Sequence, residues 1–237
     1  NIPVSRIFPD IWNGHAKASA SAFEEAGFKY LEDQNGKFED GYFPVTGSFI
    51  YERRVSAAMG YLTQGIRNRK NLTIMTESFV KEILFDGKKC IGVKVRIEGK
   101  DKKFFAKEII LSSGAIHSPA HLMRAGIGPA MDLKDKGINV LKNLGGVGQR
   151  LMDHPSINIA SFIKPEARIN EYSRRHLLVG MRYSSGLKNI PKGDMYVAVC
   201  SKTAWHSIGD QLAAFILFVN RTYSETGQVR LSTTDPY

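Results

Sequence analysis

The sequence predicts a mixed α/β fold, α+β overall, in a chain long enough for one large domain or two small ones. Three observations support this class. Segments with helical spacing of apolar residues are followed by segments that alternate or run apolar as strands do. Asp86-Gly87, a strong hairpin signal, lies between two strand-like segments. Residues 111–155 are dense in glycine, serine and proline, and a strand-rich remainder follows them.

Two helices are expected before the first strands. Residues 16–27 place the apolar side chains Ala16, Ala20 and Phe23 on one helical face and end at Gly27. Residues 53–68 show the same spacing at Val55, Met59, Leu62 and Ile66. The stretch between these helices, residues 28–50, contains several turn signals, so a long irregular connection is expected there.

A β-rich block follows the second helix. Strands are expected at residues 72–76, 79–85, 90–98 and 104–111. The third strand alternates cleanly, with Ile91, Val93, Val95 and Ile97 on one face. The fourth ends in the apolar run Ile109-Ile110-Leu111, which is typical of a buried strand.

A serine- and glycine-rich turn, residues 112–118, connects the last of these strands to a helix. Ser118 is the expected N-cap, Pro119 the first helical residue, and Gly126 the end of the helix. Ligands of α/β sheets lie beyond the carboxyl ends of the strands, and helix N-termini attract phosphate and polar groups. The turn is therefore expected to face a cofactor.

The predicted secondary structure changes after Pro155, so a domain boundary is expected near residue 155. Isolated strands separated by loops are predicted at residues 157–163, 195–200, 212–219 and 228–231. Asp153-His154, just before the boundary, could form an acid–base pair. Adjacent side chains rarely face each other and a proline follows, so a structural turn is the favoured interpretation.

Composition limits the function classes. The net charge is +10, but the basic residues are scattered, which favours an unspecific basic surface over a nucleic-acid site. No run of about 18 apolar residues occurs, so no membrane-spanning helix is expected. Cys90 and Cys200 lie in strand-like runs and are expected to be free thiols, which points to the cytoplasm. His117 and His121 lack a third ligand, so no metal site is expected.

Two blocks of the glycine-dense stretch carry a family resemblance. Gly114-Ala115-Ile116-His117-Ser118-Pro119, followed by Gly126-Ile127-Gly128, resembles the second signature of the glucose–methanol–choline (GMC) family of FAD-dependent oxidoreductases. The segment from Gly146 to Pro155 resembles the next block of that family. The resemblance extends in order over nearly the whole chain. Among the departures, Arg150 stands where the family often has Asn.

The resemblance implies a fold and a reaction. Residues 1–155 would be part of a Rossmann-like FAD-binding domain with a β-meander, and residues 156–237 part of an antiparallel-sheet substrate domain. The enzyme, an oxidase or dehydrogenase related to choline dehydrogenases, would oxidise a small alcohol to a carbonyl compound by hydride transfer to flavin.

The resemblance also implies site residues. Val80 would meet the adenine of FAD through its backbone, and Ser112, Gly114 and Ala115 would line the adenine and ribose end. From the residues alone, Val80 could equally well be an ordinary core valine. The turn could also be a tight turn that only ends a strand. The family's phosphate loop, Gly-x-Gly-x-x-Gly, does not occur in this sequence.

No catalytic residue is expected in this chain, because the family's catalytic pair, a His with a second His or Asn, lies near the C-terminus of its members. The chain starts without Met and is expected to be an internal piece of an enzyme roughly twice as long, completed by N- and C-terminal segments of the same protein. Alone, it is expected to be inactive and to bind FAD weakly or not at all. The alternatives are a basic, non-enzymatic binding module and a catalytically dead, truncated scaffold.

Overall fold

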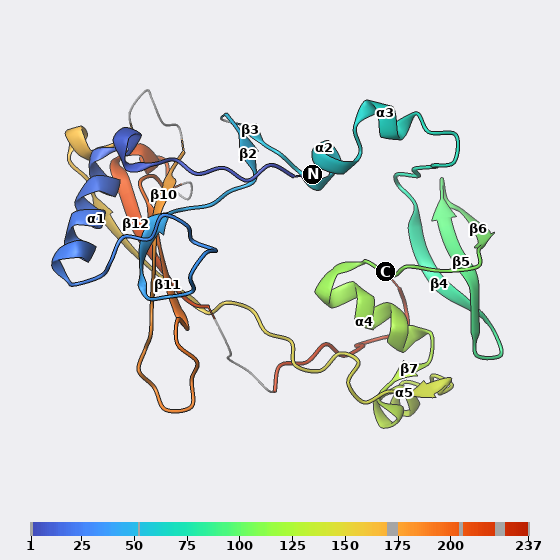
Figure 1. Cartoon of the computed structure of the whole chain (residues 1–237). Helices are drawn as coiled ribbons and strands as arrows, with labels where there is room; N and C mark the ends of the chain where they lie inside the picture. The colour runs from blue at the N-terminus through green and yellow to red at the C-terminus, as the bar shows by residue number, and fades with distance from the viewer. Residues whose placement is uncertain (1, 52, 170–174, 204–205, 221–225, 237) are drawn as a thin grey trace. The chain divides into compact units, whose positions relative to one another are not determined.

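Figure 1 shows the computed structural model of the protein. The structure describes residues 2–51, 53–169, 175–203, 206–220 and 226–236. The chain forms two compact units. The first, here called the sheet unit, consists of residues 1–72 and 153–223, and the second, the meander unit, of residues 73–152 and 224–237. The chain crosses between the units beside the predicted boundary near residue 155, but residues 1–72 group with the segment that follows it. Assignment of cofactor and substrate domains stays a prediction.

A five-stranded antiparallel sheet with the order β1-β10-β11-β12-β9 forms the centre of the sheet unit. Its strands are β1 (Gly41–Pro44), β9 (Ser156–Phe162), β10 (Leu177–Tyr183), β11 (Met195–Cys200) and β12 (Leu212–Val219). The predictions for β9, β11 and β12 are confirmed, the last two to the residue. β10 was not among the predicted strands. β1 lies inside the predicted irregular connection, because it forms only by pairing with β10, far along the chain.

Helix α1 (Gly14–Glu25) lies against strands β10 and β11 of this sheet (Figure 1). The Asn13 side chain caps it by accepting the N–H of Ala16 at 2.9 Å, and Gly27, with φ +89°, follows its end. The predicted helix is thus confirmed. Its apolar face enters the core of the unit, which comprises Trp12, Ala16, Ala20, Tyr42, Leu178, Val179, Met181, Val197 and Val199.

The remaining elements of the sheet unit are short. They are η1 (Pro9–Ile11), β2 (Phe49–Ile50), β3 (Arg53–Arg54), α2 (Ala57–Tyr61), α3 (Gln64–Arg67), η2 (Pro165–Ala167) and η3 (Gly209–Gln211). The prediction of one helix over residues 53–68 is wrong. Ser56 caps α2 by accepting the N–H of Met59, and Leu62 leaves the helical region with ψ 55°, so two single-turn helices result. Met59 is 54% exposed, so no core contact holds a longer helix together.

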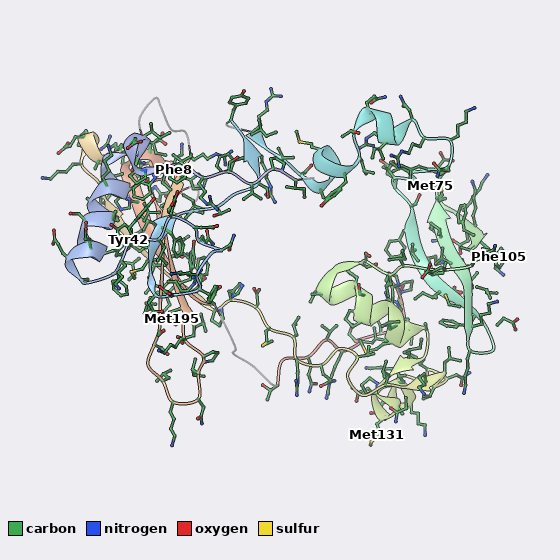
Figure 2. The ribbon with its side chains drawn as sticks, in the orientation of Figure 1. Phe8, Tyr42, Met75, Phe105, Met131 and Met195 are labelled. Carbon is green, nitrogen blue, oxygen red and sulfur yellow. The ribbon has the colours of Figure 1, made fainter. Side chains whose placement is uncertain are left out.

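The meander unit contains the antiparallel sheet β4-β5-β6 and a small helical cluster. The elements are β4 (Phe79–Asp86), β5 (Lys89–Ile97), β6 (Lys100–Phe105), α4 (Gly114–Arg124), β7 (Ile127–Gly128), α5 (Ala130–Asp135) and β8 (Lys142–Asn143). The predicted hairpin is confirmed, and Gly87 at its turn has φ +55°. A second core joins Met123, Leu133 and Val229. Phe105 and Met131 instead reach outward (Figure 2), with 67% and 79% of their surface exposed.

Three predicted strands of this unit are corrected. Residues 72–76 form no strand, and residues 228–231 contribute only a single bridge, from Gln228 to Gln149. The strand expected at 104–111 ends at Phe105, and Ile110 in its apolar run is 83% exposed rather than buried. An apolar run becomes a strand only when a neighbouring strand pairs with it, and β6 pairs with β5 only as far as Phe105.

No helix in the described ranges is both long and apolar enough to cross a lipid bilayer.

Candidate cofactor site

The four expected cofactor residues lie on two neighbouring elements of the meander unit. Val80 is on β4, half-buried and paired with Val95 of β5. Ser112, Gly114 and Ala115 lie where the chain enters α4, and all three are exposed. Because α4 packs against β4, the structure brings the two elements together. Cofactor binding by these residues stays a prediction.

The turn into α4 differs from the sequence prediction. The helix begins at Gly114, not at Pro119, and Ser113 is its N-cap without a side-chain cap bond. Ser118 is not the N-cap, because it lies within the helix. Its Oγ accepts a hydrogen bond from the backbone N–H of Ser113 at 3.0 Å. Pro119 lies within the helix and has no N–H to donate to the carbonyl of Ala115.

Gly114 gives the turn its shape. Its φ is +79°, a left-handed conformation that glycine adopts without steric cost. A Cβ at this position would meet no atom within 4 Å, so the glycine is needed for the backbone and leaves open space beside it. The exposed backbone here stands at the positive end of an 11-residue helix. These features fit the ribose and adenine end of FAD, which needs close backbone approach and hydrogen-bonding groups.

A pocket of about 310 Å³ lies beside this turn. Ala115 and Pro119 of α4 line one side of it. The other lining residues are Gly148, Gln149, Arg150, Leu151, Met152 and Val229. Sequence reasoning did not place this segment at the site. The one available signal was the departure from the family pattern at Arg150.

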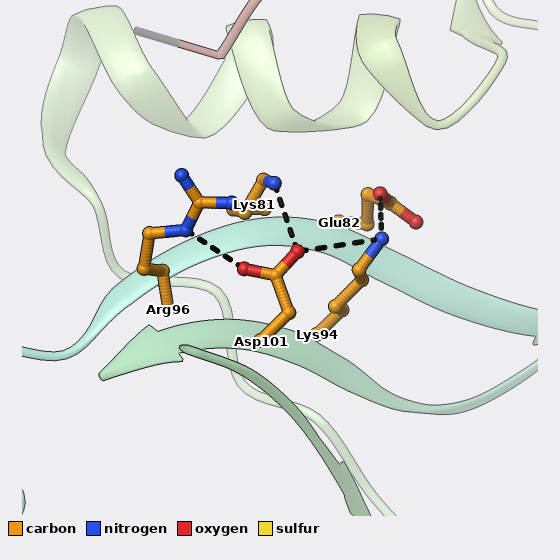
Figure 3. A network of polar contacts seen from close by, with 5 residues as sticks. All are labelled: Lys81, Glu82, Lys94, Arg96 and Asp101. Atoms are coloured by element: carbon orange, nitrogen blue, oxygen red, sulfur yellow. Dashed lines mark hydrogen bonds and ion pairs between the residues drawn. The ribbon is translucent and has the colours of Figure 1, made fainter. Parts of the chain in front are cut away.

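An ion-pair network holds β4 in register beside Val80 (Figure 3). Asp101 at the start of β6 accepts hydrogen bonds from Arg96 Nε at 2.8 Å and from Lys81 Nζ at 3.0 Å. Lys94 lies 2.8 Å from Glu82 and 3.8 Å from Asp101. Hydrogen bonds from Arg96 and Lys81 lower the pKa of Asp101 to about 2. The network joins all three strands and so fixes the backbone that Val80 would present.

The histidines show structural surroundings. His121 on α4 is buried, and its burial, followed by the charge of Arg124, lowers its pKa. Asp153 accepts the backbone N–H of His154 at 2.8 Å, and the Nδ1 of His154 lies 2.9 Å from the carbonyl oxygen of Val219. These contacts support a structural role for Asp153-His154, although the predicted turn itself is absent, because residues 151–155 form no turn or bend. Within the described ranges, no three His, Cys, Asp or Glu side chains group as metal ligands.

Both cysteines are free thiols, but only one of them is buried as expected. Cys90 on β5 is half-buried. Cys200 on β11 is buried, and this burial raises the pKa of its thiol to about 11.

The family profile described as GMC oxidoreductase matches residues 2–156. Over the whole chain, the sequence is 37% identical to 5-(hydroxymethyl)furfural oxidase of Methylovorus sp. (strain MP688), and it covers 44% of that relative. It is 40% identical over 159 residues to oxygen-dependent choline dehydrogenase of Pseudomonas putida, a match to 64% of this chain and 28% of the relative. The chain thus spans less than half the length of these relatives.

Solved structures resemble the fold over the full chain. Pyridoxine 4-oxidase from Mesorbium loti aligns with a TM-score of 0.83 and 26% identity, over 99% of this chain and 47% of that one. A formate oxidase structure aligns with a TM-score of 0.84 over 100% of this chain and 50% of its own. Its identity is 22%, so this second likeness concerns the fold alone.

Proposed function

Because this chain belongs to the GMC oxidoreductase family, we propose that it is part of an FAD-dependent enzyme that oxidises an alcohol to a carbonyl compound. The observation that carries the proposal is the match over the whole of this chain, at 37% identity, to an oxidase whose name specifies a hydroxymethyl substrate. The name of pyridoxine 4-oxidase, at 26% identity, specifies oxidation of pyridoxine, another small ring compound. A primary alcohol on a ring is therefore the proposed substrate class.

Bound FAD would accept a hydride from the carbinol carbon, while the hydroxyl proton leaves to a base. The residues of this chain would hold the cofactor rather than perform that step. The left-handed Gly114 would allow the adenosine end to approach the start of α4. Ser112 would offer its hydroxyl, Ala115 its exposed backbone, and Val80 the backbone of β4.

The division of labour along the chain is also proposed. Residues 1–155 would contribute to the FAD-binding domain and residues 156–237 to the substrate domain, with other segments of a longer protein completing both. The chain covers 44% of its oxidase relative, which is consistent with other segments completing the enzyme. The sheet of the substrate domain would then include β1 from residues 1–155, because β1 pairs with β10.

The test is flavin reduction in the complete gene product. The purified protein is expected to carry a flavin absorbance that bleaches when alcohol is added without oxygen. The panel contains 5-(hydroxymethyl)furfural, pyridoxine and choline, with the corresponding acids as unreactive controls. A protein that never binds flavin, or a bound flavin that none of the alcohols reduces, would contradict the proposal.

A flavin-free protein that binds nucleic acid with a steep salt dependence would instead favour the basic binding module. The isolated chain of 237 residues is expected to bind FAD weakly or not at all, since the phosphate loop is not in its sequence. A tight, saturable flavin titration of the isolated chain would disprove that expectation.

A further inference from the structure

Arg150 has a backbone conformation that its side chain does not favour. Its φ is +57°, in the left-handed region. A residue with a Cβ is crowded against its own carbonyl oxygen there, and only glycine and, less well, Asn or Asp adopt it readily. An arginine here keeps the strain, and such strain tends to persist where a side chain has a use.

The surrounding backbone maintains the strained conformation. Gly148 accepts the N–H of Val229 at 2.7 Å, and Leu151 donates its own N–H to Gly227 at 2.9 Å. A Cβ at Gly148 would clash with the carbonyl oxygen of Val229, so the two segments lie in close contact. Arg150 lies between these two bonds and is held in place from both sides.

Arg150 lines the pocket of about 310 Å³ that Ala115 and Pro119 also line. Among the described residues that line this pocket, Arg150 alone has a charged side chain. It is exposed, and no carboxylate among the described residues forms an ion pair with it. A lone guanidinium beside the start of α4 makes this pocket favourable for an anion.

We propose that Arg150 binds a phosphate group of FAD. The inference rests on the proposed function, because Ala115, which lines the same pocket, is one of the expected cofactor residues. A guanidinium suits phosphate better than other side chains do, since its planar N–H groups can donate two parallel hydrogen bonds. Asn fits the backbone better but carries no charge.

The experiment measures ligand affinity of the complete gene product after removal of its flavin. Arg150→Asn removes the positive charge and reduces the strain of the left-handed backbone conformation. FAD and ADP are expected to bind about tenfold more weakly to this variant, as loss of a charged hydrogen bond predicts. Adenosine, which has no phosphate, is expected to bind both proteins equally. The melting temperature of the flavin-free variant is expected to stay the same or rise by about 2 °C.

Two further variants separate charge from packing. Arg150→Gly also relieves the backbone and must weaken FAD binding as much as Arg150→Asn. Arg150→Lys keeps the charge without the planar fork and should lie between the variant and the wild type. The matched control is Lys134→Asn, an exposed cation on α5 outside this pocket, which should change no affinity.

The outcomes distinguish the two proposals. Wild-type protein that does not bind FAD overturns the proposed function and this inference with it. If the wild type binds FAD and both neutral variants bind it as tightly, only the role of Arg150 is overturned. Equal weakening of adenosine and ADP would also reject phosphate contact, because the loss would then come from the shape of the pocket.

Discussion

The hydroxyl of Tyr196 on β11 lies directly over Gly180 on the neighbouring strand β10. A Cβ at Gly180 would overlap that hydroxyl oxygen and would come within 2.9 Å of the Phe43 ring on β1. Burial raises the pKa of Tyr196 to about 12. The ring of Tyr196 continues to Phe43 and Phe218, with centroid distances of 5.8 and 6.0 Å. Three strands are thus joined by one row of rings that requires a glycine beneath it.

Gly180→Ala is expected to destabilise the protein by about 1–3 kcal/mol, because the core has no space for the added methyl group. Urea unfolding measures the loss. Gly65→Ala on α3 is the control, since a Cβ there meets no atom within 4 Å and its effect should be neutral or slightly stabilising. Adding Tyr196→Phe to Gly180→Ala should recover part of the loss. An unaltered midpoint for Gly180→Ala would show that the ring row shifts freely.

Asp101 predicts a specific acid sensitivity. Its carboxyl pKa in the folded protein is about 2, below the ordinary 3.8, because of Arg96 and Lys81. The stabilisation it provides is therefore complete above about pH 4 and is lost as the pH falls toward 2. Asp101→Asn should remove this part of the pH dependence and lower stability at neutral pH.

Unfolding free energies measured from pH 2 to pH 7 test the role of Asp101, with Glu108→Gln, on an exposed carboxyl outside the strands, as the control. The same slope between pH 4 and pH 2 in wild type and Asp101→Asn would rule out the network as its source.

The cysteines are expected to react at very different rates with a thiol reagent. Cys200 is buried and its thiol pKa is about 11, so the thiolate is scarce at neutral pH and inaccessible. Cys90 is half-buried and should be modified first. Thiol counting by absorbance in the native and denatured protein measures this, and Cys90→Ser should abolish the fast phase. A fast phase that survives in Cys90→Ser would mean that Cys200 reacts and that the sheet around the central strand β11 opens readily.

Gly114→Ala tests the turn at the start of α4. The cost should be about 1–2 kcal/mol and should arise from the backbone alone, because its φ is +79° and the space beside it is open. Gly114→Asn should cost less, since Asn tolerates left-handed backbone. Gly146→Ala, also in open space but without a positive φ, is the control for adding a methyl group nearby.

FAD affinity of the same three variants is the second readout. Gly114→Ala should weaken FAD binding more than Gly146→Ala does. Equal affinities would remove Gly114 from the proposed cofactor site while leaving its backbone role intact.

Local signals made much of the fold predictable. The Asp86-Gly87 turn and the alternation of β5 give the meander, and the apolar face of α1 gives its helix with correct burial. The predictions were wrong where the secondary structure depends on pairing with residues far away in the sequence. β1 depends on β10, and the apolar run around Ile110 has no pairing strand in the described structure. Pro119, a residue typical of a first turn, predicts too late a start for α4, because the helix already begins at the left-handed Gly114.

The candidate site could likewise be predicted only in part. Its place at the serine- and glycine-rich turn could be predicted because the turn is local in sequence. The approach of the Gly148–Met152 segment to Ala115 could not, because it depends on the packing of α4 and on bonds to residues 227–229. Arg150 shows this directly: its sequence position signalled a departure from the family, and only the backbone angle gave that departure a physical meaning.

The pairing of β1 with β10 has a consequence for biosynthesis. Asp40, at the entrance of β1, accepts a hydrogen bond from Ser184, which lies 144 positions later. During translation β1 therefore emerges long before its partner strand, while the hairpins of the meander unit can close as soon as they leave the ribosome. The nascent chain must keep β1 and the apolar face of α1 unpartnered during this delay. Chaperone demand is thus expected to be concentrated on the first 72 residues, and pulse proteolysis of stalled nascent chains would show it.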